Sequence, residues 1–128
     1  MIRIDHLDHL VLTVQDIEAT CHFYSHVLGM SVVEFADGRK ALHFGGQKIN
    51  LHNADSRFYP RAQNPTEGSA DLCFITQTPL DDVIKTLIDL HVPIVAGPID
   101  KIGALGPIRS VYIRDPDNNL LELSNTLF

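Results

Sequence analysis

Two strand-like runs that are otherwise almost entirely apolar carry residues that could do chemistry. His9 opens the run "HLVLTV", and Glu122 lies within "NLLELSN". A carboxylate buried on such a strand is costly unless it is paired or bound to a metal. Imidazole nitrogen and carboxylate oxygen suit Zn, Ni, Mn or Fe(II), and a metal site with an open position supports Lewis-acid chemistry. We therefore expect His9 and Glu122 to be metal ligands, and any proton transfer to use Glu122 or a metal-bound water.

Other polar residues could complete such a site. Side chains two residues apart on a strand share a face, so Asn50 and His52 point the same way, as do Asp71 and Cys73. His52 offers a ring nitrogen and Asp71 a carboxylate oxygen, whereas the amide oxygen of Asn50 is a weak ligand. Asp71 is equally well interpreted as a hydrogen-bond acceptor that opens its strand, and both interpretations stay open.

The elements that position these residues follow one order twice. We expect a strand at 8–14, a helix at 16–29 and strands at 30–36, 40–45 and 47–54, then a strand at 70–76, a helix at 78–92 and strands at 93–99, 108–115 and 119–125. Asp16 and Thr78 are the expected helix N-caps, and Gly29 suits the end of the first helix. The offset from Asp16 to Thr78 is 62 residues, as it is from His9 to Asp71. A repeated βαβββ unit, and hence an α+β fold, accounts for this pattern.

We expect a single domain, 1–128, made of module one at 5–54, a loop at 55–69 and module two at 70–128. The loop is polar and holds the cluster "RFYPR", which could cover a substrate. The glycine-spaced "IGALGPIRS" is interpreted as a flexible lid. Cys21 and Cys73 are most simply core thiols.

Composition excludes several classes of partner. The 128 residues carry a net charge of −6 with no concentration of Lys or Arg, which argues against nucleic-acid binding. No apolar run approaches the roughly 20 residues that a membrane span needs, and no secretory signal is recognisable. Two cysteines make no disulfide framework, so we expect a cytoplasmic protein.

The stretches "DHLVLTVQDIEATCHFYSHVLGM" and "IRDPDNNLLELSN" resemble the vicinal oxygen chelate superfamily, which includes glyoxalase I, bleomycin-resistance proteins and extradiol dioxygenases. "QKINLH" and "GSADLCFIT" resemble more narrowly the glyoxalase-domain proteins with virulence-associated members. The resemblance implies two βαβββ modules that form partial barrels, with His9, Asn50 or His52, Asp71 and Glu122 converging on a divalent metal. His9 and Glu122 match the family's first and last ligands. Glyoxalase I has glutamate at the position of Asn50 and histidine at that of Asp71.

The resemblance implies a metal-dependent enzyme that acts on a small substrate with neighbouring oxygen atoms. In glyoxalase itself, a lactoylglutathione lyase, this is the hemithioacetal of methylglyoxal and glutathione, so a glutathione adduct is a candidate substrate. Two alternatives stay open: an Fe(II) dioxygenase using His9, His52 and Glu122, and a metal-free protein that binds an antibiotic or metabolite. The resemblance also implies a homodimer in which His9 of one chain faces Glu122 of the other.

Overall fold

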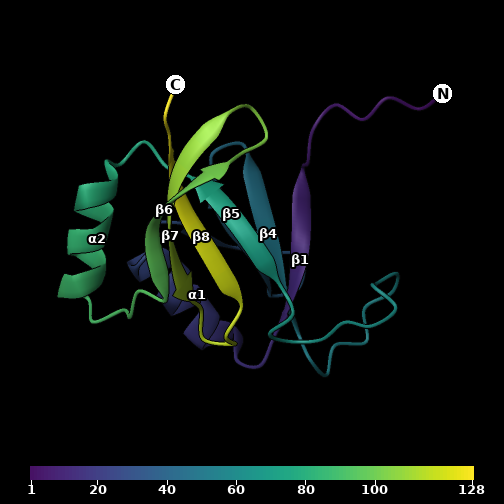
Figure 1. Cartoon of the computed structure of the whole chain (residues 1–128). Coiled ribbons are helices and arrows are strands. Elements are labelled where there is room, and N and C mark those ends of the chain that lie inside the picture. Colours follow the sequence, from purple (N-terminus) through teal and green to yellow (C-terminus); the bar gives the residue numbers. More distant parts are fainter. The chain divides into compact units, whose positions relative to one another are not determined.

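The computed structural model describes all 128 residues and divides into two compact units, Met1–Gly68 (unit 1) and Ser69–Phe128 (unit 2). Each unit holds one helix and one four-stranded sheet (Figure 1). Unit 1 contains β1 (His9–Val14), α1 (Ile17–His26), β2 (Ser31–Phe35), β3 (Arg39–Phe44) and β4 (Gln47–Asn53). Unit 2 contains β5 (Asp71–Ile75), α2 (Leu80–Asp89), β6 (Ala96–Ile102), β7 (Pro107–Arg114) and β8 (Leu120–Thr126).

The two sheets have the same topology. Their strand orders are β1-β4-β3-β2 and β5-β8-β7-β6, with the first pair parallel and the others antiparallel. Both sheets are open rather than closed barrels. The predicted α+β fold with a repeated βαβββ unit is confirmed. Each helix has ten residues, and neither is long and apolar enough to cross a membrane.

The core of unit 1 lies between α1 and one face of its sheet. Every second residue of β1 and β4 turns toward this face, and the side chains buried there include Leu12, Val14, Ile49 and Leu51. The α1 side chain of Tyr24 is fully buried as well. Burying an aliphatic side chain of this size stabilises the fold by about 1.5–3 kcal/mol. The opposite, helix-free face of the sheet carries His9 and Thr13 of β1 and Lys48, Asn50 and His52 of β4.

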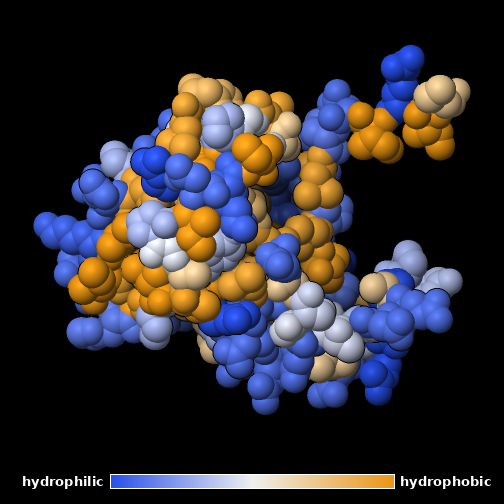
Figure 2. All heavy atoms as spheres, in the orientation of Figure 1, coloured by the Kyte–Doolittle hydropathy of each residue, from blue (hydrophilic) through white to orange (hydrophobic).

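Unit 2 is built in the same way. Leu87 of α2 is buried, as are Val111 and Ile113 of β7 and Leu121 and Leu123 of β8. Period-two alternation then sends the neighbouring residues of β7 and β8 to the helix-free face. The loop between the two units has a largely hydrophilic surface (Figure 2), in keeping with its polar sequence.

The helix ends differ in how well the sequence predicts them. Asp16 caps α1 as expected, since its Oδ1 accepts from the Ala19 N–H at 3.1 Å, and Gly29 follows the helix with φ 69°. The expected N-cap Thr78 is wrong. The α2 backbone instead begins at Leu80, whose N–H donates to Oδ1 of Asn125 at 2.7 Å. A side chain from β8, 45 residues further along the chain, therefore caps α2.

The segment interpreted as a lid is mostly regular structure. β6 continues to Ile102, three residues beyond the expected strand, and β7 begins at Pro107. Between them the Gly103 N–H donates to the Gly106 carbonyl oxygen at 2.8 Å, which closes a tight turn. The segment is thus the tip of a β-hairpin.

Candidate functional site

Glu122 stands at the middle of β8, between two other strands of unit 2. In the sheet register it lies beside Cys73 of β5 on one side and beside Tyr112 of β7 on the other. Paired positions share a face, so the thiol, the carboxylate and the phenol are neighbours on the helix-free face. Leu120 and Ser124, two residues to either side of Glu122 on β8, lie on the same face.

A short hydrogen-bond chain holds the Glu122 carboxylate from beneath. The Ser110 hydroxyl donates to Oε2 of Glu122 at 2.6 Å, and it lies 2.6 Å from the Ser124 hydroxyl. The Cys73 Sγ atom lies 3.4 Å from the same Ser124 hydroxyl. Both serines are completely buried, so no bulk water competes for the Ser110 bond to the carboxylate.

The two neighbours of Glu122 keep their protons at neutral pH. Burial raises the pKa of the Tyr112 phenol, and the nearby Glu122 carboxylate raises it further. Partial shielding from water likewise raises the pKa of the Cys73 thiol, although the residue as a whole is exposed, and the hydrogen bond with Ser124 opposes this. Both groups therefore offer a proton donor beside an acceptor.

These side chains open onto a cavity of about 480 Å³ within unit 2. Its polar wall is formed by Cys73, Tyr112 and Glu122, with Lys101 as a basic residue of the lining. The remaining wall is mostly apolar and comes largely from the β6–β7 hairpin and the C-terminal residue. It consists of Ile75, Ile102, Gly103, Ala104, Leu105, Gly106, Ile108, Thr126 and Phe128. An apolar cavity with a few convergent polar groups is the usual form of a small-molecule site.

The other predicted site residues lie as follows. Asp71 is exposed at the start of β5 and lies on the same face as Glu122. It pairs with Leu120, however, and so lies two residues along the strand from Cys73, the residue that pairs with Glu122. In unit 1, Asn50 is buried with an unpartnered Oδ1, and His52 is half-buried. The His9 side chain is 44% exposed, and its Nδ1 lies 2.8 Å from Asp8 Oδ2.

The expected metal ligands do not fit a metal centre within either unit. In the β1–β4 register His9 lies beside Lys48 and His52 lies beside Thr13. The two histidines are thus four residues apart along the strands, about 13 Å, whereas metal–nitrogen bonds are about 2 Å. No group of three or more His, Cys, Asp or Glu side chains could hold an ion. The convergence of His9 with Glu122 stays a prediction.

Sequence reasoning missed Ser110 and Tyr112, and it misplaced Cys73. Cys73 is exposed on the Glu122 face rather than in the core, while Cys21 is buried as expected. The signal for Ser110 and Tyr112 was present. The runs 108–115 and 119–125 flank the turn sequence "DPDNN", so pairing them as a hairpin places alternate residues of one beside Glu122 of the other.

Comparison with known proteins adds a family match. The model of the Glyoxalase/Bleomycin resistance protein/Dioxygenase superfamily matches residues 6–123. The virulence protein STM3117 of Salmonella typhimurium is 57% identical over 121 residues, covering 94% of this chain and 84% of that protein. The glyoxalase domain-containing protein RDO1 of Mycosarcoma maydis is 53% identical over 119 residues, covering 93% and 67%.

Solved structures agree with the fold. The crystal structure of STM3117 matches with a TM-score of 0.97 and 55% identity, covering 98% of this chain and all of that one. A lactoylglutathione lyase from Agrobacterium tumefaciens matches at TM-score 0.74 and 24% identity (96% and 95% covered). The antibiotic-binding protein TnmS3 of a Streptomyces species matches at 0.75 and 20% (98% of each covered). The last two share the fold, which is the glyoxalase-like vicinal oxygen chelate fold predicted from the sequence.

Proposed function

Since the chain belongs to the Glyoxalase/Bleomycin resistance protein/Dioxygenase superfamily, we propose that unit 2 holds the acid–base site of a glyoxalase-like enzyme. The observation that carries this proposal is the Glu122 carboxylate, which lines a cavity and receives a 2.6 Å hydrogen bond from buried Ser110. The substrate class is a small molecule with oxygen atoms on neighbouring carbons. The candidate reaction is an isomerisation of the lactoylglutathione lyase type.

Glu122 acts as the base in this scheme. Its carboxylate removes a proton from the carbon that carries the substrate hydroxyl, and it returns the proton to the neighbouring carbonyl carbon. The hydroxyl proton passes from the first oxygen to the second, so the carbonyl and the hydroxyl exchange places. Negative charge develops on the substrate oxygens while the proton is on Glu122. The phenol of Tyr112 and the thiol of Cys73 flank the carboxylate and can donate hydrogen bonds to those oxygens, since their raised pKa keeps both protonated. Ser110 keeps the carboxylate aimed into the cavity.

The test is turnover of the hemithioacetal formed from methylglyoxal and glutathione. We expect Glu122→Gln, which keeps the shape of the side chain, to lower kcat by at least about a hundredfold. Glu67→Gln changes an exposed glutamate of the loop and is the matched control. Equal turnover by wild type and Glu122→Gln would overturn the proposal.

A metal-free binding protein is the second candidate, because most of the cavity wall is apolar. The same variant separates the two functions. A binding protein has no turnover to lose and keeps its ligand affinity in Glu122→Gln when the ligand contacts mainly the apolar wall. An enzyme loses turnover while its affinity for substrate changes little.

We also propose that the chain binds a divalent metal and forms a homodimer. Members of the superfamily often bind divalent metals, and His9 and Glu122 are the residues we assign as ligands. Added Mn, Ni or Zn should raise the melting temperature of wild type and not that of His9→Ala or Glu122→Ala. His52→Ala is the comparison variant, and we expect it to keep the shift because of its distance from His9 along the sheet. The proposed homodimer is tested separately, by sedimentation velocity of the wild-type chain.

A further inference from the structure

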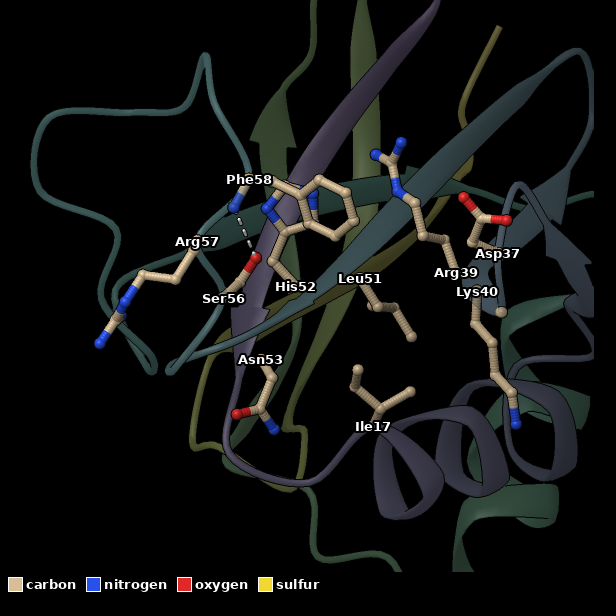
Figure 3. Close-up of a pocket in the computed structure, with 11 residues that line it drawn as sticks. Ile17, Asp37, Arg39, Lys40, Leu51, His52, Asn53, Ser56, Arg57 and Phe58 are labelled. Carbon is tan, nitrogen blue, oxygen red and sulfur yellow. Dashed lines mark hydrogen bonds between the residues drawn. The ribbon is translucent and has the colours of Figure 1, made fainter.

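Unit 1 contains a cavity of its own, where the end of its sheet meets the loop after β4. Its volume is about 530 Å³. Its lining includes Arg39 of β3, Leu51 and His52 of β4, and Ser56, Arg57 and Phe58 of the loop. Figure 3 shows the His52 and Phe58 rings stacked together, Arg39 reaching toward the same side and Arg57 pointing away from them.

Arg39 carries a positive charge with no acidic partner. Its guanidinium carbon lies 4.4 Å from the centre of the Phe58 ring and 4.9 Å from that of Phe35. It takes part in none of the ion pairs of the protein. Its Nε atom is buried without a hydrogen-bond partner. A buried N–H without a partner destabilises the fold, and a charged donor without one destabilises it more.

His52 presents a second unpartnered nitrogen beside the same aromatic ring. Its Nε2 atom is buried and has no hydrogen-bond partner, and its ring centre lies 5.4 Å from that of Phe58. Phe58 therefore contacts both Arg39 and His52, and both residues line the same cavity. Two such atoms at one cavity are what an acceptor-rich ligand would satisfy.

The surrounding charges give this cavity an excess of positive charge. Arg57 and Arg61 donate to the backbone carbonyls of Asp55 and Ser56 rather than to carboxylates, so their charges are not neutralised. Lys40 also lines the cavity but is paired with Glu18 at 2.5 Å. Asp37 is the acidic residue of the lining.

We propose that this cavity binds a small oxyanion, a carboxylate or a phosphate, through the guanidinium of Arg39 and the imidazole of His52. The planar guanidinium suits two oxygens of either group, which it can contact together. Phe58 and Leu51 supply an apolar wall for the rest of the ligand. The chain carries a net charge of −6, so arginines without an acidic partner are a local exception to its overall charge. This site goes beyond the proposed enzyme function and does not depend on Glu122.

Inorganic phosphate and benzoate are the two probes, and titration followed by amide NMR at low ionic strength is the measurement. We expect shifts confined to the amides around Arg39 and residues 52–58. Arg39→Gln, which keeps much of the length but loses the charge, should weaken binding by about tenfold or more. Added salt should weaken it as well. Tighter binding of phosphate or of benzoate identifies which oxyanion the cavity prefers.

Arg109→Gln is the matched control, because Arg109 is a half-exposed arginine of unit 2 that pairs with Asp100. It should bind both probes like wild type. Arg39→Lys keeps the charge but loses the planar guanidinium that contacts two oxygens together. It should therefore bind the probes more weakly than wild type. The amide spectrum of each variant shows whether it is folded. The proposal is overturned when folded Arg39→Gln binds as tightly as wild type, or when neither probe shifts the amides of unit 1.

Discussion

The Ser110 hydroxyl lies 2.6 Å from Oε2 of Glu122 and links neighbouring strands of the same sheet. Ser110 is completely buried, so no bulk water competes for its hydrogen bond to the carboxylate. Removing the hydroxyl leaves the carboxylate in place but without the donor that orients it.

We therefore expect Ser110→Ala to lower kcat by about tenfold while KM changes little. The loss follows because the carboxylate is no longer held in the orientation in which it removes the substrate proton. Steady-state turnover of the hemithioacetal is the measurement. Ser31→Ala removes an exposed hydroxyl from β2 and should leave kcat unchanged. An unchanged kcat in Ser110→Ala would show that this bond has no part in positioning the base.

Tyr112→Phe isolates the contribution of the phenol. The ring and its packing remain, while the donor beside Glu122 is lost. We expect kcat to fall about tenfold or more with KM little changed, because the hydrogen bond strengthens as charge develops on the substrate. Tyr59→Phe, at a ring that is 91% exposed, is the control. A rise in KM with constant kcat would instead assign Tyr112 to substrate binding.

Asn125 should matter more for stability than its place near the end of β8 suggests. Its Oδ1 caps Leu80, and its Nδ2 donates to the carbonyls of Thr76 and Thr78. We expect Asn125→Ala to lower the free energy of unfolding by about 1–3 kcal/mol, since it leaves the first turn of α2 without its cap. Urea denaturation measures this change. Asn64→Ala removes an exposed loop amide and should have almost no effect.

His52 makes stability depend on pH. Burial, followed by the charges of Arg39 and Arg61, lowers its pKa below the ordinary value of 6.5. The unfolded chain then binds a proton more readily than the folded one, so the free energy of unfolding falls as pH drops below about 6.5 and through the lowered folded pKa. In His52→Gln this part of the loss should disappear, while His22→Gln, at an exposed helix position, should follow wild type. The measurement is the melting temperature of wild type and of both variants, recorded as the pH is lowered through this range.

Local periodicity predicted the faces of the strands but not their partners. Alternation alone puts His9 on one face of its strand and His52 on one face of another. That β1 pairs with β4, with His9 beside Lys48 rather than beside His52, depends on contacts between residues about 40 positions apart. The sequence pattern therefore predicted which face of its strand each histidine occupies. It did not predict how far apart the two histidines lie along the sheet.

The long-range cap of α2 escaped prediction for a similar reason. Thr78 stands where a local side-chain cap is expected, but Asn125 reaches the helix from the last strand. Cys73 was assigned to the core from its type, although its parity with Asp71 put it on the helix-free face. For both residues the tertiary neighbours override the local preference.

The parallel pairing of β1 with β4 has a consequence for the order of events during synthesis. β1 leaves the ribosome before β4, its hydrogen-bonding partner, which follows about 40 residues later. At about 5–20 residues per second the nascent strand waits roughly 2–8 s with its backbone groups unpaired. Through that interval the β2–β3 hairpin can form, but the sheet of unit 1 lacks the strand that joins β1 to it. Nascent chains arrested before Gln47 should thus expose an unpaired apolar strand, of the kind that chaperones bind.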